Sequence, residues 1–365
     1  MAKLGELGKI ITGNTPKTSD AQNYESNDIC FVKPSDFTDN EITEIHQSEF
    51  YISAYAKDKA RVLPTDSILV TCIGIIGKVA INKVPCAFNQ QINAIIPERK
   101  ICDPRYVAYA IQNVQPQMQN TANAAVVPIL NKTRFSNIEI PLPSLETQKQ
   151  IVEFLDKVTS LISLRKQQLA KLDELVKARF VEMFGEPMSN PMGWKRVRFD
   201  SISENLDSKR VPVTESDRKD GIYPYYGASG IVDWINDYIF DEDILLVSED
   251  GANLLMRSTP IAFSVSGKSW VNNHAHVVRF HDFATQKFIE VYFSLIDISE
   301  YITGTAQPKL NQAKLNAMLF CWPPLALQNQ FATFVERVDQ QKQTVQQSLE
   351  KLELMKKALM QEYFG

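Results

Sequence analysis

Apolar positions recur every three or four residues along two long stretches of the chain. At residues 151–183 the spacing alternates between four and three without interruption, and the same spacing returns at 331–363, which lies 180 residues later. An a/d pattern held over several heptads predicts a coiled-coil helix. The stretches also end alike, at 182–185 and 362–365. The pattern therefore predicts two copies of one long helix.

The two repeated helices are predicted to pair with each other as an antiparallel coiled coil. In the first helix Arg165 and Arg179 occupy seam positions at which the second helix has aliphatic residues. In the second helix Lys342 and Lys356 occupy seam positions at which the first helix has aliphatic residues. The stems of such side chains cover apolar surface while their charges reach water. The alternative is that each helix packs only on its own domain. The predicted seam comprises Ile151, Leu155, Val158, Ile162, Leu169, Leu172, Val176, Val335, Val338, Val345, Leu349, Leu352 and Leu359.

The segments before the two helices also resemble each other. Residues 65–70 match 242–247, since each is an apolar run that follows an acidic turn and leads into a glycine. Residues 127–131 match 307–311, again at an offset of 180. Short β-branched runs bounded by turns predict strands. The sequence therefore predicts an α+β fold in which a domain and its helix occur twice in tandem.

The duplication divides the chain into four predicted segments. A cluster of Pro, Gly and Asn at 186–193 is the clearest linker. The loops at 14–50 and 207–230 share no evident pattern, as expected of two sites with different specificity on a common frame. The predicted segments are a first domain at 1–144, a central helix at 145–185, a second domain at 186–324 and a C-terminal helix at 325–365.

Composition constrains the compartment and the partners. The five cysteines are scattered and form no C-x-x-C pair, which indicates a reducing cytoplasm. No apolar run reaches the length of about 18 residues that a membrane span needs, and no signal-peptide core is evident at the N-terminus. The formal net charge of the 365 residues is −4. DNA binding would therefore depend on local basic clusters or on a partner protein.

Candidate catalytic motifs fail on spacing. Residues 74–78 have two residues between their glycines, whereas a phosphate loop needs four, so we expect a turn between strands with Lys78 exposed. His274 and His276 alternate on a predicted strand, but a metal site would need a third ligand from residues 281–282. No dinucleotide-binding fingerprint is evident. The sequence therefore predicts neither a metal site nor a cofactor site, and indicates a protein that recognises rather than catalyses.

Several short motifs in the duplicated frame carry a family resemblance. They are residues 13–16 (Gly-Asn-Thr-Pro), 32–37 (Val-Lys-Pro-Ser-Asp-Phe), 68–81, 89–91, 223–230 and 304–310, together with the Pro- and Gln-containing segments that begin the two long helices. Over essentially its whole length the chain resembles the specificity subunits of type I restriction–modification systems. It departs from the commonest pattern because the first unit starts at Leu4, without the Trp-Lys pair that opens the second unit at Trp194.

The resemblance implies a function and a set of partners. Two target-recognition domains would each read one half of a split asymmetric site in double-stranded DNA. The long helices would fix the spacer between the halves and dock two DNA methyltransferase subunits, through which the motor-nuclease restriction subunits join. The chain itself would be cytoplasmic, without membrane contact and non-catalytic. S-adenosylmethionine, ATP and Mg would belong to the partner subunits.

Candidate DNA-binding residues follow from the chemistry of the grooves. Bases are read by polar side chains in the major groove, while contacts to phosphate hold the register. For each candidate, the alternative is a solvated surface residue or a residue that stabilises a turn. The candidates are Asn14, Thr15, Lys17, Lys33, Ser35, Lys78, Gln90, Gln91, Lys132 and Arg134 in the first domain, and Lys209, Arg210, Tyr225, Tyr226, Ser229, Arg257, Lys268, Asn272, Asn273 and Lys309 in the second.

Two other classes of protein are alternatives. An adhesive or structural coiled-coil protein with two β-rich heads would need an export signal, which is not evident. A self-contained nuclease would need a cluster of carboxylates and a lysine with the spacing of a metal site, which is also not evident. A methyltransferase gene beside this gene would favour DNA recognition, and secretion genes would favour adhesion.

Overall fold

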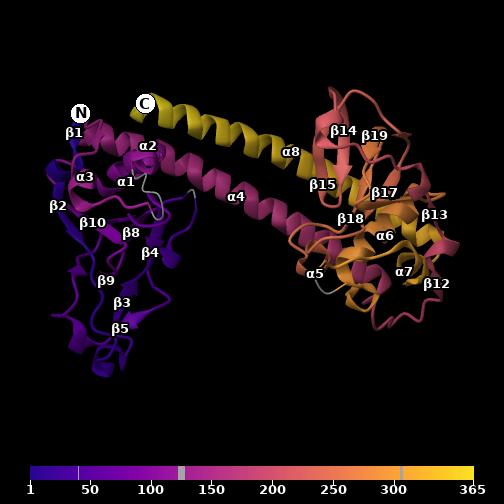
Figure 1. Ribbon diagram of the computed structural model, residues 1–365, viewed down its shortest axis with the longest axis horizontal. Coiled ribbons are helices and arrows are strands. Elements are labelled where there is room, and N and C mark those ends of the chain that lie inside the picture. Colours follow the sequence, from indigo (N-terminus) through magenta and orange to yellow (C-terminus); the bar gives the residue numbers. More distant parts are fainter. Residues whose placement is uncertain (40, 122–127, 305–306) are drawn as a thin grey trace. The chain divides into compact units, whose positions relative to one another are not determined.

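The computed structural model describes residues 1–39, 41–121, 128–304 and 307–365. These residues form two compact units. Unit 1 comprises Met1–Leu164 and Leu349–Gly365, and unit 2 comprises Arg165–Ser348. Each unit has its own sheets (Figure 1). Each unit also has its own core of buried apolar side chains.

Two helices of 40 residues each contribute one part to unit 1 and the other part to unit 2. They are α4 (Leu145–Phe184) and α8 (Leu325–Phe364). The predicted seam side chains are buried or half-buried along both helices. None of the helices in the described part of the chain is long and apolar enough to cross a membrane.

The contacts within each unit show the direction in which the helices pair. In unit 1, Leu155 from the first half of α4 shares a core with Phe364 at the end of α8. In unit 2, Phe180 from the second half of α4 lies edge-on to Phe331 in the first half of α8, with 5.4 Å between the ring centroids. The beginning of each helix therefore packs beside the end of the other, which confirms the predicted antiparallel pairing.

A buried glutamine anchors the first turn of each long helix. The amide of Gln148 donates to the carbonyl of Pro143 at 2.9 Å and accepts the backbone N–H of Asp103 at 2.9 Å. Gln328 likewise donates to the carbonyl of Pro323 at 2.9 Å. Because both glutamines are fully buried, their hydrogen bonds fix the point at which the chain leaves the sheets and enters the helix.

Unit 1 contains two larger sheets and a two-stranded edge sheet. The five-stranded sheet has the order β2-β10-β7-β8-β4 and is antiparallel except for the pair β4 and β8, and the four-stranded sheet β5-β3-β9-β6 contains one parallel pair, β3 and β9. The strands are β1 (Ala2–Lys3), β2 (Gly8–Thr12), β3 (Ile29–Val32), β4 (Thr43–Ile45), β5 (Tyr51–Ile52), β6 (Val62–Leu63), β7 (Ile68–Thr71), β8 (Val79–Asn82), β9 (Cys86–Phe88), β10 (Ile92–Pro97) and β11 (Glu139–Ile140).

Short α-helices complete the described part of unit 1. They are α1 (Pro104–Asn113), α2 (Gln115–Thr121) and α3 (Lys132–Ser136). Asp103 caps α1 by accepting the N–H groups of Arg105 and Tyr106, and Pro104 occupies the first helical position, where no N–H is needed. The buried face of α1 packs on β7 and β8.

Unit 2 repeats this architecture. Its two larger sheets have the orders β13-β20-β17-β18 and β15-β14-β19-β16, the second again with one parallel pair, β14 and β19, and β12 pairs with β21 in a two-stranded edge sheet. The strands are β12 (Arg196–Arg198), β13 (Glu204–Asn205), β14 (Asp220–Gly227), β15 (Gly230–Ile235), β16 (Phe240–Asp241), β17 (Ile244–Ser248), β18 (Ala262–Val265), β19 (Lys268–Val271), β20 (Ala275–Arg279) and β21 (Leu319–Cys321). The helices are α5 (Asn253–Met256), α6 (Phe283–Leu295) and α7 (Gln312–Ala317). The predicted tandem α+β duplication is therefore confirmed.

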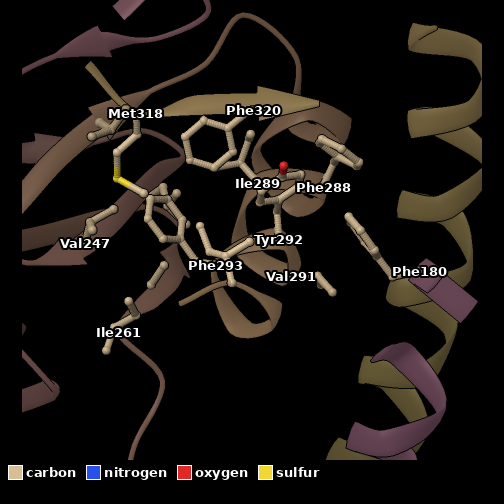
Figure 2. Close-up of a cluster of buried hydrophobic side chains, with 14 of the residues drawn as sticks. Phe180, Val247, Ile261, Phe288, Ile289, Val291, Tyr292, Phe293, Met318 and Phe320 are labelled. Atoms are coloured by element: carbon tan, nitrogen blue, oxygen red, sulfur yellow. The ribbon is translucent and has the colours of Figure 1, made fainter. Parts of the chain in front are cut away.

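An aromatic cluster joins the second half of α4 to the core of unit 2. Figure 2 shows Phe180 directed from the helix towards the aromatic side chains of α6. Its ring stacks on Phe288 with 5.1 Å between centroids, and Tyr292 in turn lies 4.8 Å from Phe320 of β21. These buried rings make the long helix part of the domain core, which positions the sheet relative to this half of the helix.

Candidate nucleic-acid interface

Three loops of unit 1 meet at one edge of its five-stranded sheet. They follow β2 (residues 13–15), join β7 to β8 (72–78) and join β9 to β10 (89–91). The backbone N–H of Cys72 donates to the carbonyl of Gln91 at 2.7 Å and ties the last two together. Loops at the end of a rigid sheet are the usual place for recognition residues.

A fourth segment completes this edge. The N–H of Gly74 donates to the carbonyl of Pro128 at 3.1 Å, and the N–H of Leu130 donates to the carbonyl of Cys72 at 2.9 Å. Asn131 then caps α3 by accepting the N–H of Arg134. Residues far apart in the sequence are thus fixed beside the loop between β7 and β8.

Unit 2 builds the same edge with the same hydrogen bonds. The N–H of Gly251 donates to the carbonyl of Pro308 at 3.0 Å, and the N–H of Leu310 donates to the carbonyl of Glu249 at 2.8 Å. Asn311 caps α7 as Asn131 caps α3. The two edges therefore share a backbone frame, and their side chains can be compared position by position.

In unit 1, part of the predicted set gathers at this edge. Thr15 donates to the amide oxygen of Gln90 at 2.7 Å, which links the loop after β2 to the loop after β9. A cleft of about 340 Å³ opens beside them, and Lys33 lies on it with its ammonium 3.1 Å from the ring centroid of Phe50. The cleft is lined by Thr15, Thr18, Tyr24, Phe31, Lys33, Phe50, Tyr51, Asn89 and Gln91.

Other predicted residues of unit 1 have local structural partners. Lys78 was expected to be exposed, but its side chain is only 12% exposed and its ammonium pairs with Asp39 at 2.7 Å. The amide of Asn14 donates to the carbonyl of Lys59 at 2.8 Å and so stabilises a turn. Ser35 donates to a carboxylate oxygen of Glu49 at 3.3 Å. Lys17 is exposed, and Lys132 and Arg134 are exposed on α3, directly after the segment that completes the edge.

In unit 2, five predicted residues are exposed. Ser229 lies at the tip of the hairpin of β14 and β15, and Asn273 lies in the turn between β19 and β20. Lys309 lies at the edge, with its ammonium 3.1 Å from Glu249. Lys209 is exposed after β13, and the ammonium of Lys268 lies 4.6 Å from the ring centroid of Tyr238. The structure thus presents Ser229, Asn273 and Lys309 on neighbouring loops of one edge.

The remaining predicted residues of unit 2 are engaged in the interior. Tyr225 is buried, and Asn272 is buried and accepts the N–H of His274 at 2.8 Å. The guanidinium of Arg257 donates to the carbonyls of Phe293 and Ile296 at 3.0 and 2.9 Å, which satisfies the end of α6. Arg210 forms an ion pair within the unit, and the half-buried ring of Tyr226 packs against another aromatic ring. Their side chains are occupied by tertiary partners, so we leave them out of the interface proposed below.

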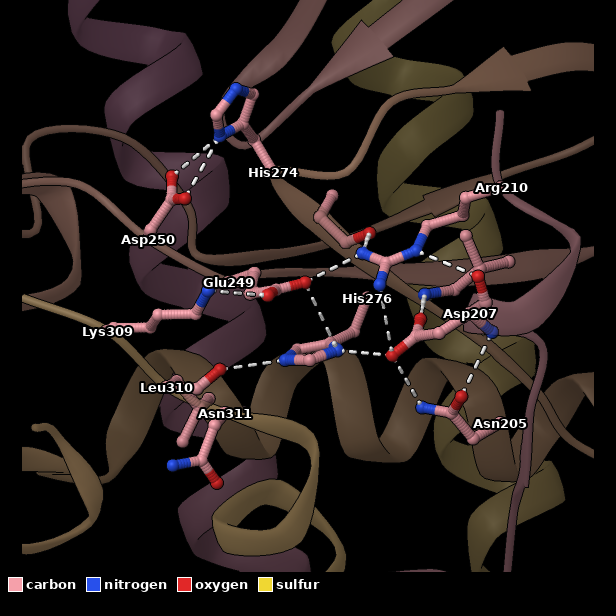
Figure 3. Close-up of polar contacts among 12 residues, drawn as sticks. Asn205, Asp207, Arg210, Glu249, Asp250, His274, His276, Lys309, Leu310 and Asn311 are labelled. Atoms are coloured by element: carbon pink, nitrogen blue, oxygen red, sulfur yellow. Dashed lines mark hydrogen bonds and ion pairs between the residues drawn. The ribbon is translucent and has the colours of Figure 1, made fainter. Parts of the chain in front are cut away.

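A buried ion-pair network underlies the edge of unit 2 (Figure 3). Nδ1 of His276 lies 2.6 Å from a carboxylate oxygen of Asp207, and Nε2 lies 2.8 Å from the carbonyl oxygen of Leu310. A carboxylate and a carbonyl are both acceptors, so the two nitrogens of the buried ring face acceptors on both sides. Arg210 bridges the network by donating to Glu249 at 2.7 Å.

The acidic residues of the network are held in the charged form. Burial raises the pKa of Asp207, but the hydrogen bond and charge of His276 outweigh it and bring that pKa below its usual value. Burial likewise raises the pKa of Glu249, but the hydrogen bonds from Arg210 and Lys309 together with the nearby charge of His276 outweigh burial and bring this pKa below its usual value as well. Both carboxylates therefore stabilise the fold at neutral pH.

Metal binding does not fit this arrangement. Asp207, Glu249 and His276 offer ligand atoms within 4.8 Å of one another. Each carboxylate already pairs with a cation of the protein, however, and both nitrogens of His276 face acceptors. His274, expected beside His276 on one strand face, lies instead in the preceding turn and pairs with Asp250 at 3.0 Å.

Unit 1 has a neutral counterpart of this network, at residues that were not among the candidates predicted from the sequence. Asn93 occupies the place of His276, donates to the carbonyl of Leu130 at 3.4 Å and accepts a hydrogen bond from Thr12 at 2.6 Å. Asn93 and Leu130 thus correspond to His276 and Leu310. An alignment of β10 with β20 could have revealed this correspondence, because it places the amide and the imidazole at equivalent positions of the two strands.

Comparison with known proteins agrees with the duplicated frame. The family model described as "Type I restriction modification DNA specificity domain" matches residues 1–174 and 191–354. The MjaIX specificity subunit of Methanocaldococcus jannaschii is 24% identical over 374 residues, which cover 92% of this chain and 85% of that protein. The HindI specificity subunit of Haemophilus influenzae is 31% identical over 188 residues, which cover 50% of this chain and 40% of that protein.

Solved structures resemble the fold as well. The S subunit of a type I restriction–modification system from M. genitalium matches with a TM-score of 0.58 at 12% identity, covering 100% of this chain and 95% of that chain. A chain from a structure concerned with assembly and conformational transition of the type I system matches with a TM-score of 0.55 at 14% identity, covering 99% of this chain and 96% of that chain. At these identities the similarity concerns the fold.

Proposed function

Because this chain belongs to the family of type I restriction–modification DNA specificity proteins, we propose that it reads a split asymmetric DNA target, one half with each unit. Its role in that family is DNA recognition and not catalysis. In this proposal the loops at the edge of each unit enter the major groove, where all four base pairs are distinguishable.

The observation that carries the proposal is the pair of edges with one frame and different side chains. Unit 1 presents Thr15, Gln90 and Gln91, whereas unit 2 presents Asn273 and Lys309. Amide and ammonium groups favour different bases, since amides pair best with adenine and Lys with guanine. Two half-sites of different sequence follow from that difference.

The basic side chains near the edges are proposed to hold phosphates rather than bases. Lys17, Lys132 and Lys209 are exposed on loops or on the short helix beside the edges. Such contacts fix the register and make affinity fall with salt. The net charge of −4 supports weak binding by the chain alone and tighter binding together with partner subunits.

The long helices are proposed to dock two DNA methyltransferase subunits, through which the restriction subunits join. In unit 1 they expose the apolar side chains of Phe154, Leu161, Leu164 and Met355. Such exposed apolar side chains on a helix pair mark contact surfaces for other proteins. In this proposal each of the two repeats docks one methyltransferase subunit. S-adenosylmethionine, ATP and Mg would then be bound by these partners.

The length of the helices is proposed to set the gap between the half-sites. Each helix has 40 residues, or about 60 Å at 1.5 Å per residue. A helix of fixed length is a suitable spacer, because its rise per residue does not vary with the DNA sequence. The gap would therefore be constant while the half-sites differ among relatives.

Selection from a random duplex library tests this function. The chain is mixed with type I methyltransferase subunits from the same host, and bound duplexes are enriched and sequenced. The expected motif has two fixed blocks separated by a constant number of unspecified base pairs. One continuous block, or no enrichment by a complex that forms normally, would contradict the proposal.

A further inference from the structure

Two exposed isoleucines lie at the recognition edge of unit 1. Ile75 is 62% exposed and Ile129 is 49% exposed. Ile129 forms an antiparallel bridge with Ile73, and the N–H of Gly74 donates to the carbonyl of Pro128 at 3.1 Å. The turn that carries Ile75 and the segment that carries Ile129 are therefore fastened to each other.

The turn holds Ile75 in a fixed position. The next residue, Ile76, is buried, and its carbonyl accepts hydrogen bonds from Gln115 and Gln119 at 3.2 and 3.3 Å. Gly77 has a φ of +87° and packs against Gln115, a conformation that other residues rarely adopt. An exposed side chain on a turn secured in this way has a defined direction and loses little further entropy when it binds.

The corresponding position in unit 2 has the opposite chemistry. Lys309 forms the same bridge, to Asp250, that Ile129 forms to Ile73. The frame thus accepts an ammonium group as readily as an aliphatic one. An exposed isoleucine at this place adds nothing to the core of unit 1, so its apolar character is free to serve recognition.

The major groove of DNA has one prominent apolar group, the C5-methyl of thymine. We propose that Ile75 and Ile129 read the methyl group of a thymine in the half-site recognised by unit 1. The inference rests on the proposed function, and it adds specificity-determining residues that are not polar. Gln90 and Gln91 lie on the adjoining loop, so hydrogen bonds to neighbouring base edges accompany the methyl contact.

Replacing thymine by deoxyuridine removes this methyl group and leaves base pairing unchanged. The experiment uses the chain in complex with its methyltransferase subunits, and duplexes carrying the selected motif with one thymine at a time replaced in the unit 1 half-site. At one position the affinity of the native complex should fall about fourfold, the factor that burial of one methyl group contributes.

Variants connect that loss to the two side chains. Ile75→Ala and Ile129→Ala should bind the thymine duplex more weakly and should no longer distinguish thymine from deoxyuridine, whereas Ile129→Val should retain the distinction. Ile101→Ala is the matched control, because Ile101 is 42% exposed but follows the opposite end of β10. It should discriminate like the native complex.

Three results would overturn this inference and leave the proposed function intact. They are specific binding that is insensitive to deoxyuridine, discrimination that persists in both alanine variants, and a unit 1 half-site that contains no thymine. Failure to select any split motif would instead overturn the proposed function itself. The two failures are therefore distinguishable.

Discussion

At the scale of single residues, buried charges distinguish the edge of unit 2 from that of unit 1. His276 stands between Asp207 and the carbonyl of Leu310, where Asn93 stands between Thr12 and Leu130 in the first repeat. In each unit these hydrogen bonds attach the segment that completes the recognition edge to a strand of the sheet. The charged set also holds Lys309, through Glu249, at the surface. The network thus positions a side chain that we propose to contact DNA.

Removing the charge of Asp207 should therefore destabilise unit 2. Asp207→Asn leaves His276 without the carboxylate that lies 2.6 Å from its Nδ1, while Arg210 keeps Glu249, and breaking a buried pair in this way costs about 3 kcal/mol. The free energy of unfolding in urea measures the loss. Asp243→Asn is the matched control, because Asp243 is exposed and should change stability by less than about 0.5 kcal/mol. Equal losses in the two variants would contradict the network's role.

The same network should make stability depend on acid pH. The pKa values of Asp207 and Glu249 are lower in the folded state than in the unfolded state, where they are about 4. Their stabilisation is therefore complete above about pH 4 and is lost as pH falls through the lower, folded values. Unfolding free energies between pH 2 and pH 6, at roughly unit intervals, should fall less steeply for Glu249→Gln than for the native chain. Parallel curves would show that this carboxylate does not supply the dependence.

At the scale of elements, the long helices serve both the domain cores and an outer surface. Phe180 is buried among the aromatic rings of unit 2, whereas Phe154, on the same helix, is exposed in unit 1. Internal packing accounts for the first and gives no reason for the second. We attribute the exposed apolar positions to methyltransferase docking.

Charged substitutions on that surface test the attribution. Phe154→Glu and Leu161→Glu should reduce methyltransferase binding at least tenfold, because each places a carboxylate in an apolar contact. Affinity is measured with purified subunits, and circular dichroism of the isolated chain checks that the helices persist. Met188→Glu, a change at an exposed apolar residue of the linker, is the control. Full methyltransferase binding by both helix variants would refute docking at this surface.

Changes in helix length test the spacer. Four extra residues in α4 alone add about 6 Å and displace its seam by about half a heptad, so DNA binding should be lost or the gap altered. Seven extra residues in both helices keep the seam and add about 10 Å, which corresponds to a gap longer by about three base pairs. Selection of bound duplexes measures the gap. An unchanged gap in a complex that still binds would refute the spacer role.

At the scale of the whole molecule, the sequence predicted the repeated elements better than the exposure of single side chains. The helices and the duplication were predictable, because a heptad period and an offset of 180 can be recognised along the chain. The burial of Lys78, Arg210 and Arg257 was not, because their partners are Asp39, Glu249 and the carbonyls at the end of α6. Such partners come together only in the folded chain.

The recognition edges illustrate the same limit. Polar loop residues such as Gln90 and Lys309 could be proposed from composition alone. The exposure of Ile75 and Ile129 could not, since isoleucine in a strand-rich segment ordinarily predicts a core position. Their exposure depends on the bridge and the hydrogen bond between residues 73–74 and 128–129, which form only in the folded chain.

The two units are proposed to read two different half-sites of a single target. A map of modified bases across the host genome, with and without this gene, tests this claim. Loss of methylation at one split, asymmetric motif on deletion is the expected result, and exchange of residues 1–144 for those of a relative should change only one half of that motif. Continued methylation of every motif after deletion, in cells that express the methyltransferase, would contradict the claim.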